Sequence, residues 1–124
     1  NKRQIKKVIS VIKEAKKPIV YIGGGAVLSN AGELVREFVN TTQIPAVETL
    51  MAKGVLRYND PLNLGMVGMH GTYAANMAMS EADLMISFGA RFDDRVTGRL
   101  DEFAKHAKVI HIDIDPTSIS KIVH

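Results

Sequence analysis

Residues 65–98 read GMVGMHGTYAANMAMSEADLMISFGARFDDRVTG, and this stretch decides the fold. A glycine-spaced loop around His70 leads into residues 72–82, which favour a helix. The apolar run LMISF at 84–88 then predicts a buried strand that ends at a glycine. The charged cluster RFDDR at 91–95 follows directly. Because parallel α/β sheets bind ligands at the carboxyl ends of their strands, we expect the loop and the cluster to face a ligand.

The remaining chain alternates apolar runs that are typical of strands with stretches of helical periodicity. Further strands are predicted over residues 19–22, 44–50 and 109–113. Helices are predicted over residues 3–16, around 34–39 with Ser29 or Asn30 as cap, over 100–106, and as a final turn that begins at Pro116. This alternation predicts an α/β fold, a three-layer α/β/α sandwich with a mainly parallel, Rossmann-like sheet.

A chain of 124 residues suits one domain. We expect a lead-in helix over residues 1–17 and a cofactor-binding domain over residues 18–124. The chain begins at Asn1, and it ends inside a predicted helical turn. We therefore expect it to be part of a larger enzyme.

The composition argues against several classes of protein. The net charge is +3, and the lysines concentrate at residues 2–17 without interleaved aromatic residues, which favours a solvated helix face over a nucleic-acid surface. The absence of cysteine excludes a disulfide scaffold, a thiolate zinc site and a cysteine nucleophile. No apolar run approaches the length of about 18 residues that a membrane span needs.

Three glycines at 23–25 follow the first predicted strand, where a dinucleotide-binding module places its glycine turn. The GxGxxG pattern fails here, because Leu28 occupies the position of its third glycine. Gly24 still allows a ligand to approach the backbone closely. A plain turn between strand and loop is the alternative.

Two further positions lie where a strand or a loop is expected to meet a ligand. Thr49 offers a hydroxyl and a backbone N–H to an adenine or ribose, whereas Glu48 fits either a ribose acceptor or a capping or exposed glutamate. His70 lacks companion ligands for zinc at suitable spacing, so it is either a ligand contact or a structural loop residue. Thr72 follows at the expected start of a helix, whose N–H groups would suit an anion.

The charged cluster and the last predicted strand supply the other candidates. The forked guanidinium groups of Arg91 and Arg95 match a carboxylate or a phosphate, and neighbouring aspartates can orient them. A salt-bridged surface loop is the alternative. At the end of the last strand, Asp113 is placed to accept from a sugar hydroxyl, whereas Asp115 suits a helix cap.

The motifs GMHGT at 68–72, GARFDDRVTG at 89–98 and HIDIDP at 111–116 closely resemble one family. It is the central domain of the catalytic (large) subunit of acetohydroxyacid synthase, or acetolactate synthase, a thiamine-diphosphate enzyme, most closely in its bacterial form. The resemblance covers the chain from residue 18 onward. It implies a reaction that condenses two pyruvates, or pyruvate and 2-oxobutyrate, with loss of CO₂ in branched-chain amino acid biosynthesis.

The resemblance also implies cofactors and partners. Thiamine diphosphate and Mg²⁺ would bind in two outer domains of the same polypeptide, which would form a homodimer or homotetramer with a regulatory small subunit. This domain would hold FAD, which does no net redox chemistry. The implied FAD contacts are Gly24, Thr49, Leu50, Val67, Gly68, Met69, His70, Gly89, Ala90, Arg91, Phe92, Asp93, Asp113 and Ile114.

Two residues of the cluster have an implied role toward the substrate. Arg95 resembles the arginine that receives the carboxylate of the acceptor ketoacid, and Asp94 would orient it. The resemblance implies no catalytic residue and no metal ligand in this domain. We therefore expect the isolated chain to be inactive. We also expect a cytoplasmic protein without nucleic-acid or membrane partners.

Other readings fit the same fold. One is the central domain of another thiamine-diphosphate enzyme, of the glyoxylate carboligase or oxalyl-CoA decarboxylase type. A second is a free-standing NAD-dependent oxidoreductase module, against which Leu28 and the lack of a substrate domain argue. The others are a nucleotide-binding module without catalysis and a structural or dimerising domain with an empty site.

Overall fold

The structure, a computed structural model, describes residues 2–28, 31–49, 52–68, 71–89, 107–115 and 118–123. Its strands are β1 (Pro18–Ile22), β2 (Ala46–Glu48), β3 (Asn63–Met66), β4 (Leu84–Phe88), β5 (Lys108–Asp115) and β6 (Ser118–Val123). Its helices are α1 (Lys2–Glu14), α2 (Gly25–Leu28), α3 (Gly32–Thr42) and α4 (Tyr73–Glu81).

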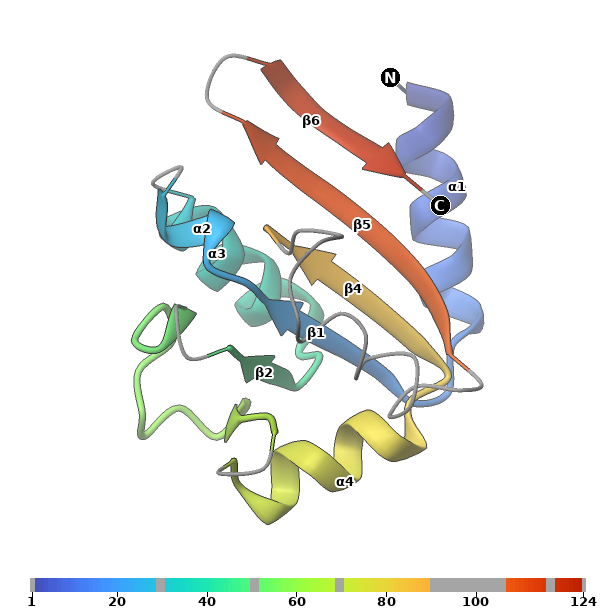
Figure 1. Ribbon diagram of the computed structural model, residues 1–124. Helices are drawn as coiled ribbons and strands as arrows, with labels where there is room; N and C mark the ends of the chain where they lie inside the picture. The colour runs from blue at the N-terminus through green and yellow to red at the C-terminus, as the bar shows by residue number, and fades with distance from the viewer. Residues whose placement is uncertain are drawn as a thin grey trace.

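Within these ranges the strands form one six-stranded sheet in the order β3-β2-β1-β4-β5-β6 (Figure 1). The strands from β1 to β5 run parallel, and β6 pairs antiparallel with β5. The register is regular between the inner strands, whereas the outer pairs β2–β3 and β5–β6 each contain a register shift. The order of strands reverses between β1 and β4, which is where parallel α/β sheets usually bind ligands.

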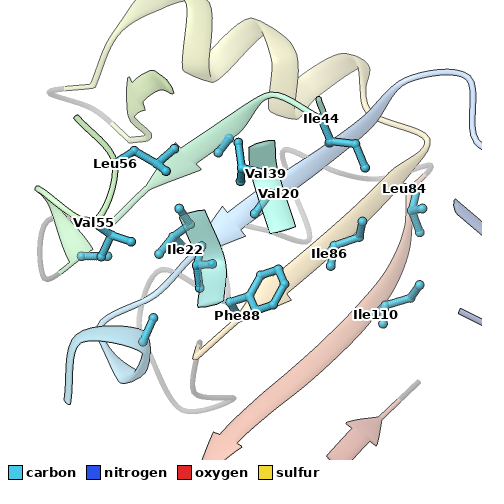
Figure 2. Packing of buried hydrophobic residues seen from close by; sticks show 14 of the residues in the cluster. Val20, Ile22, Val39, Ile44, Val55, Leu56, Leu84, Ile86, Phe88 and Ile110 are labelled. Atoms are coloured by element: carbon cyan, nitrogen blue, oxygen red, sulfur yellow. The ribbon is translucent and has the colours of Figure 1, made fainter. Parts of the chain in front are cut away.

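One face of the sheet packs against α1, α2 and α3. Alternate residues of each strand point to this face, and Val20, Ile86 and Phe88 join Val8 of α1 and Val39 of α3 in one buried cluster (Figure 2). The ring of Phe88 also meets the ring of Phe38 edge to face, with centroids 5.1 Å apart. The helical periodicity of α1 and α3 is thereby explained, since their apolar stripes cover this face.

The opposite face packs against α4. Ile19, Tyr21 and Met85 from the intervening strand positions form a second buried cluster with Ala75 and Met79 of that helix. Helices therefore cover both faces of a mainly parallel sheet. The predicted three-layer α/β/α architecture is confirmed.

Several predicted elements are found close to their predicted bounds. The strand over residues 84–88 has the same bounds in β4, and the helix over 72–82 is α4. The described lysines of α1, such as Lys6, Lys7 and Lys13, are exposed, as expected for a solvated helix face. No helix in the described ranges has both the length and the apolar character needed to cross a membrane.

Two predictions about the sheet edges are wrong or incomplete. The final helical turn after Pro116 is replaced by β6, whose backbone pairs with β5 at Asp113↔Lys121 and Ile112↔Ile122. The edge strand β3 was not predicted, because its sequence NLGM contains glycine and no β-branched residue. The helix predicted over residues 100–106 lies outside the described residues.

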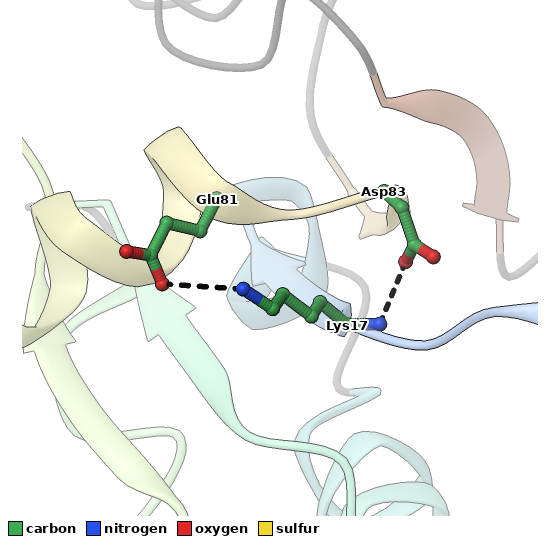
Figure 3. A network of polar contacts seen from close by, with 3 residues as sticks. All are labelled: Lys17, Glu81 and Asp83. Carbon is green, nitrogen blue, oxygen red and sulfur yellow. Dashed lines mark hydrogen bonds and ion pairs between the residues drawn. The ribbon is translucent and has the colours of Figure 1, made fainter.

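A polar contact holds together the amino ends of β1 and β4, at the edge of the sheet opposite the carboxyl ends of the parallel strands. The carboxylate of Asp83 accepts from the backbone N–H groups of Lys16 (2.7 Å) and Lys17 (2.9 Å). Both hydrogen bonds lower the pKa of Asp83, and the bond from Lys16 has the larger effect. The Lys17 ammonium also lies 3.8 Å from the carboxylate of Glu81 (Figure 3). The start of β1 is therefore tied to the start of β4.

Candidate functional site

Backbone hydrogen bonds join the carboxyl ends of the five parallel strands side by side. The N–H donors and carbonyl acceptors are Val67 to Glu48 (3.2 Å), Thr49 to Ile22 (3.0 Å), Gly23 to Phe88 (2.8 Å) and Gly89 to Ile112 (3.3 Å). Each bond links the residue at or just beyond one strand end to the neighbouring strand. The loops that leave these strands consequently begin along one continuous edge.

The predicted site positions that the structure describes are distributed along this edge. Gly24 follows β1, Thr49 follows β2, Val67 and Gly68 follow β3, and Gly89 follows β4. Asp113 and Ile114 lie near the carboxyl end of β5. The predicted residues Leu50, Met69, His70, Ala90, Arg91, Phe92, Asp93, Asp94 and Arg95 lie outside the described residues.

Thr49 carries a buried hydroxyl that has no hydrogen-bond partner within the described part of the chain. The residue is 5% exposed, and its Oγ1 is one of two such buried side-chain oxygens there, with that of Ser87. The backbone of Thr49 is satisfied, because its N–H donates to Ile22 and its carbonyl accepts from Ala52. Since buried polar groups are normally hydrogen-bonded, this hydroxyl suits a polar group of a bound molecule.

Two glycines are in direct backbone contact at the point where the strand order reverses, between the carboxyl ends of β1 and β4. The N–H of Gly25 donates to the carbonyl of Gly89 at 2.9 Å. Gly89 has φ +69°, and a Cβ built on it would lie 2.3 Å from the backbone nitrogen of Ala26. A Cβ on Gly25 would lie 2.6 Å from the Gly89 carbonyl oxygen. Packing of the protein against itself therefore requires glycine at both positions.

Gly68 differs from this pair, because no described residue lies against its open side. Its φ is +118°, and a Cβ built on it would meet no atom of the described residues within 4 Å. The N–H and the carbonyl of Gly68 are both held by the side chain of Asn76, at 3.0 and 2.9 Å. Gly68 thus presents a fixed backbone with room beside it.

Glu48, at the end of β2, is buried and organises the loop that follows. Its carboxylate accepts from the N–H of Gly54 at 3.1 Å. Burial raises the pKa of Glu48, while hydrogen bonds from the Asn63 side chain and from the backbone of Gly54, Val55 and Leu56 act in the opposite direction. Of the readings that the sequence left open, the structure supports a capping glutamate.

Glu48→Gln tests this pH dependence. Because the folded pKa is raised, the stability that Glu48 contributes is fully present below its ordinary pKa of 4.5 and is lost as the pH rises through the folded value. The variant lacks this titration. Its free energy of unfolding, relative to wild type, should therefore increase as the pH rises above about 4.5, as urea titrations would measure. Glu37→Gln, at an exposed position, is the control. The assignment would be contradicted if the difference in unfolding free energy between Glu48→Gln and wild type did not change with pH, or changed no more than that for Glu37→Gln.

Comparisons with known proteins agree with this architecture. The family model "Thiamine pyrophosphate enzyme, central domain" matches residues 5–124. The acetolactate synthase large subunit of Cyanidium caldarium is 56% identical over 96% of the chain. A probable acetolactate synthase large subunit of Methanococcus aeolicus is 54% identical over 98%, and the acetolactate synthase of Mycobacterium bovis is 52% identical over 98%.

The chain spans about one fifth of the length of each of these relatives (20%). The match nevertheless covers the chain almost completely, including every strand of the sheet. The chain belongs to the central-domain family of the thiamine pyrophosphate enzymes.

Proposed function

We propose that this chain is the FAD-holding central domain of an acetolactate synthase large subunit. In this proposal the edge formed by the strand ends binds the extended cofactor. Arg95 receives the carboxylate of the acceptor ketoacid, and Asp94 orients Arg95. Thiamine diphosphate and Mg²⁺, held by other domains of the polypeptide, supply the decarboxylation chemistry. The whole protein makes acetolactate from two pyruvates, or the corresponding product from pyruvate and 2-oxobutyrate.

The observation that carries the proposal is the line of joined strand ends with an unsatisfied buried hydroxyl among them. Thr49 supplies a hydroxyl to a polar group of the cofactor, and Gly68 leaves space beside its backbone. Several strand tips on one edge suit a ligand as long as FAD, because each loop contacts a different part of it. The similarity to acetolactate synthases supports the enzyme assignment.

The proposal also covers the surroundings of this domain. Residues 18–124, with the lead-in helix over 1–17, act as one domain beside the thiamine-binding domains. The complete polypeptide forms a homodimer or homotetramer with a regulatory small subunit, and it acts in the cytoplasm.

Two measurements on the intact protein that carries this chain test the proposal. The fluorescence of FAD should be quenched when the protein is titrated into it. Acetolactate should form from pyruvate only when thiamine diphosphate and Mg²⁺ are present. FAD binding without any carboligation would favour a different thiamine-diphosphate enzyme. Binding of NADH without binding of FAD would overturn the cofactor assignment.

Gly68→Ala should weaken FAD binding about 10-fold or more, because the added methyl group would occupy the space in which the cofactor lies. Gly54→Ala is the matched control: Gly54 also has positive φ (+102°), and a Cβ built on it would also meet no atom of the described part of the chain within 4 Å. Both variants carry the same kind of backbone strain, so only contact with FAD distinguishes them. Equal dissociation constants for FAD in the two variants, by fluorescence titration, would contradict a contact at Gly68.

A further inference from the structure

The side chain of Asn76 holds both polar backbone groups of one residue in the loop between β3 and α4. Asn76 lies in the first half of α4 and is half-buried. The N–H of Gly68 donates to Asn76 Oδ1 at 3.0 Å, and Asn76 Nδ2 donates to the Gly68 carbonyl at 2.9 Å. A primary amide suits this task because it offers a donor and an acceptor side by side.

The other hydrogen bonds of this loop hold it near its ends, except that the N–H of Gly71 also donates to the Gly68 carbonyl, at 3.0 Å. The N–H of Val67 donates to the Glu48 carbonyl at 3.2 Å, which anchors the loop to β2. The N–H of Thr72 donates to the Met66 carbonyl at 2.9 Å, and the Thr72 hydroxyl donates to the carbonyl of Leu64. The contacts of Val67 and Thr72 fix where the loop leaves β3 and where it enters α4. Between them, Asn76 shares the Gly68 carbonyl with the Gly71 N–H, and among the described residues it is Asn76 that also holds the Gly68 N–H.

We propose that Asn76 is a positioning residue for the cofactor, acting through Gly68. The proposal rests on the proposed FAD site. With φ +118°, Gly68 has a backbone conformation that glycine adopts readily, and the Asn76 amide selects one orientation of it. The open side of Gly68 then faces the cofactor in a fixed geometry. Without the amide, the loop has to be ordered when FAD binds, and the affinity falls by the cost of that ordering.

The test compares Asn76→Ala with Ser80→Ala in the intact protein. Both changes place alanine on α4, and Ser80 is exposed, so the pair controls for the higher helix propensity of alanine. Loss of two neutral hydrogen bonds should raise the dissociation constant for FAD about 10- to 30-fold in Asn76→Ala. Ser80→Ala should bind FAD as wild type does. Hydrogen exchange at the Gly68 amide should be faster in Asn76→Ala with no cofactor bound.

The outcomes separate this inference from the FAD assignment. A dissociation constant for Asn76→Ala within about twofold of wild type would overturn the positioning role while leaving the FAD site intact. Wild-type protein that binds no FAD would overturn the site itself, and the positioning role with it. A purely structural role would lower the melting temperature and leave the dissociation constant of the folded protein unchanged.

A second variant covers the case in which Asn76→Ala does not fold. Asn76→Asp keeps the shape and the acceptor for the Gly68 N–H, but it cannot donate to the Gly68 carbonyl when ionised. Its dissociation constant for FAD should rise about 5-fold or more at neutral pH. Wild-type affinity in this variant would overturn the proposal.

Discussion

Replacing Gly89 with alanine is expected to lower the free energy of unfolding by about 4 kcal/mol. Two costs add at this position. The backbone has φ +69°, which disfavours a residue with a Cβ, and the new methyl carbon would lie 2.3 Å from the Ala26 nitrogen. That neighbour is backbone, so relief requires the loop after β1 to move away from β4. Denaturant titration followed by circular dichroism would measure the loss.

Gly54→Ala separates the two costs. It also introduces a Cβ at positive φ, but into open space, so its cost should be about 1 to 2 kcal/mol. Gly25→Ala tests the other side of the contact, where a Cβ would lie 2.6 Å from the Gly89 oxygen. Equal losses of unfolding free energy for Gly89→Ala and Gly54→Ala would show that the close contact between Gly89 and the backbone after β1 contributes nothing to stability.

Ile86→Ala is expected to cost about 4 kcal/mol. Ile86 is 0% exposed in the central strand β4, and it lies in register between Val20 of β1 and Ile110 of β5 (Figure 2). Truncation removes three carbons from a cluster fixed by the sheet on one side and by helices on the other. Since the strands cannot close the space, a cavity remains and adds to the lost burial. The same denaturant titration would measure it.

Ile9→Ala is the matched control for this truncation. Ile9 lies on α1 and is 46% exposed, so the same chemical change should alter the free energy of unfolding by less than about 1 kcal/mol. Similar losses at the two positions would mean that Ile86 is not part of a rigid core.

The inner sheet could be predicted from the sequence because its strands are short, apolar and bounded by glycine or proline. The run at 84–88 became β4 without any change of bounds. The edges could not be predicted in the same way. β3 is defined by its backbone pairing with β2, and β6 by its pairing with β5, and neither pairing has a signal in local composition. Tertiary contacts decided both, against a helical reading in the case of β6.

The sequence could predict which candidate residues follow strand ends, but not the contacts that support them. Strand ends identify Thr49, Gly68 and Gly89, because a parallel sheet brings all its carboxyl ends to one edge. The roles of Asn76 and Glu48 depend on backbone groups eight and six residues away along the chain, respectively. An isolated asparagine in a helix has no pattern that reveals such a partner. Only the turn between β3 and α4 brings Asn76 to Gly68.

The register shifts of the two outer strand pairs have a consequence for the behaviour of the chain in solution. A straight, regular edge strand is a template on which a strand of another molecule can add, and repeated addition leads to aggregates. Here β3 is short and contains Gly65 at φ +103°, and the pairing of β3 with β2 and that of β6 with β5 each contain a register shift. Irregular edge strands of this kind discourage edge-to-edge growth of the sheet, while the inner strands keep their regular pairing.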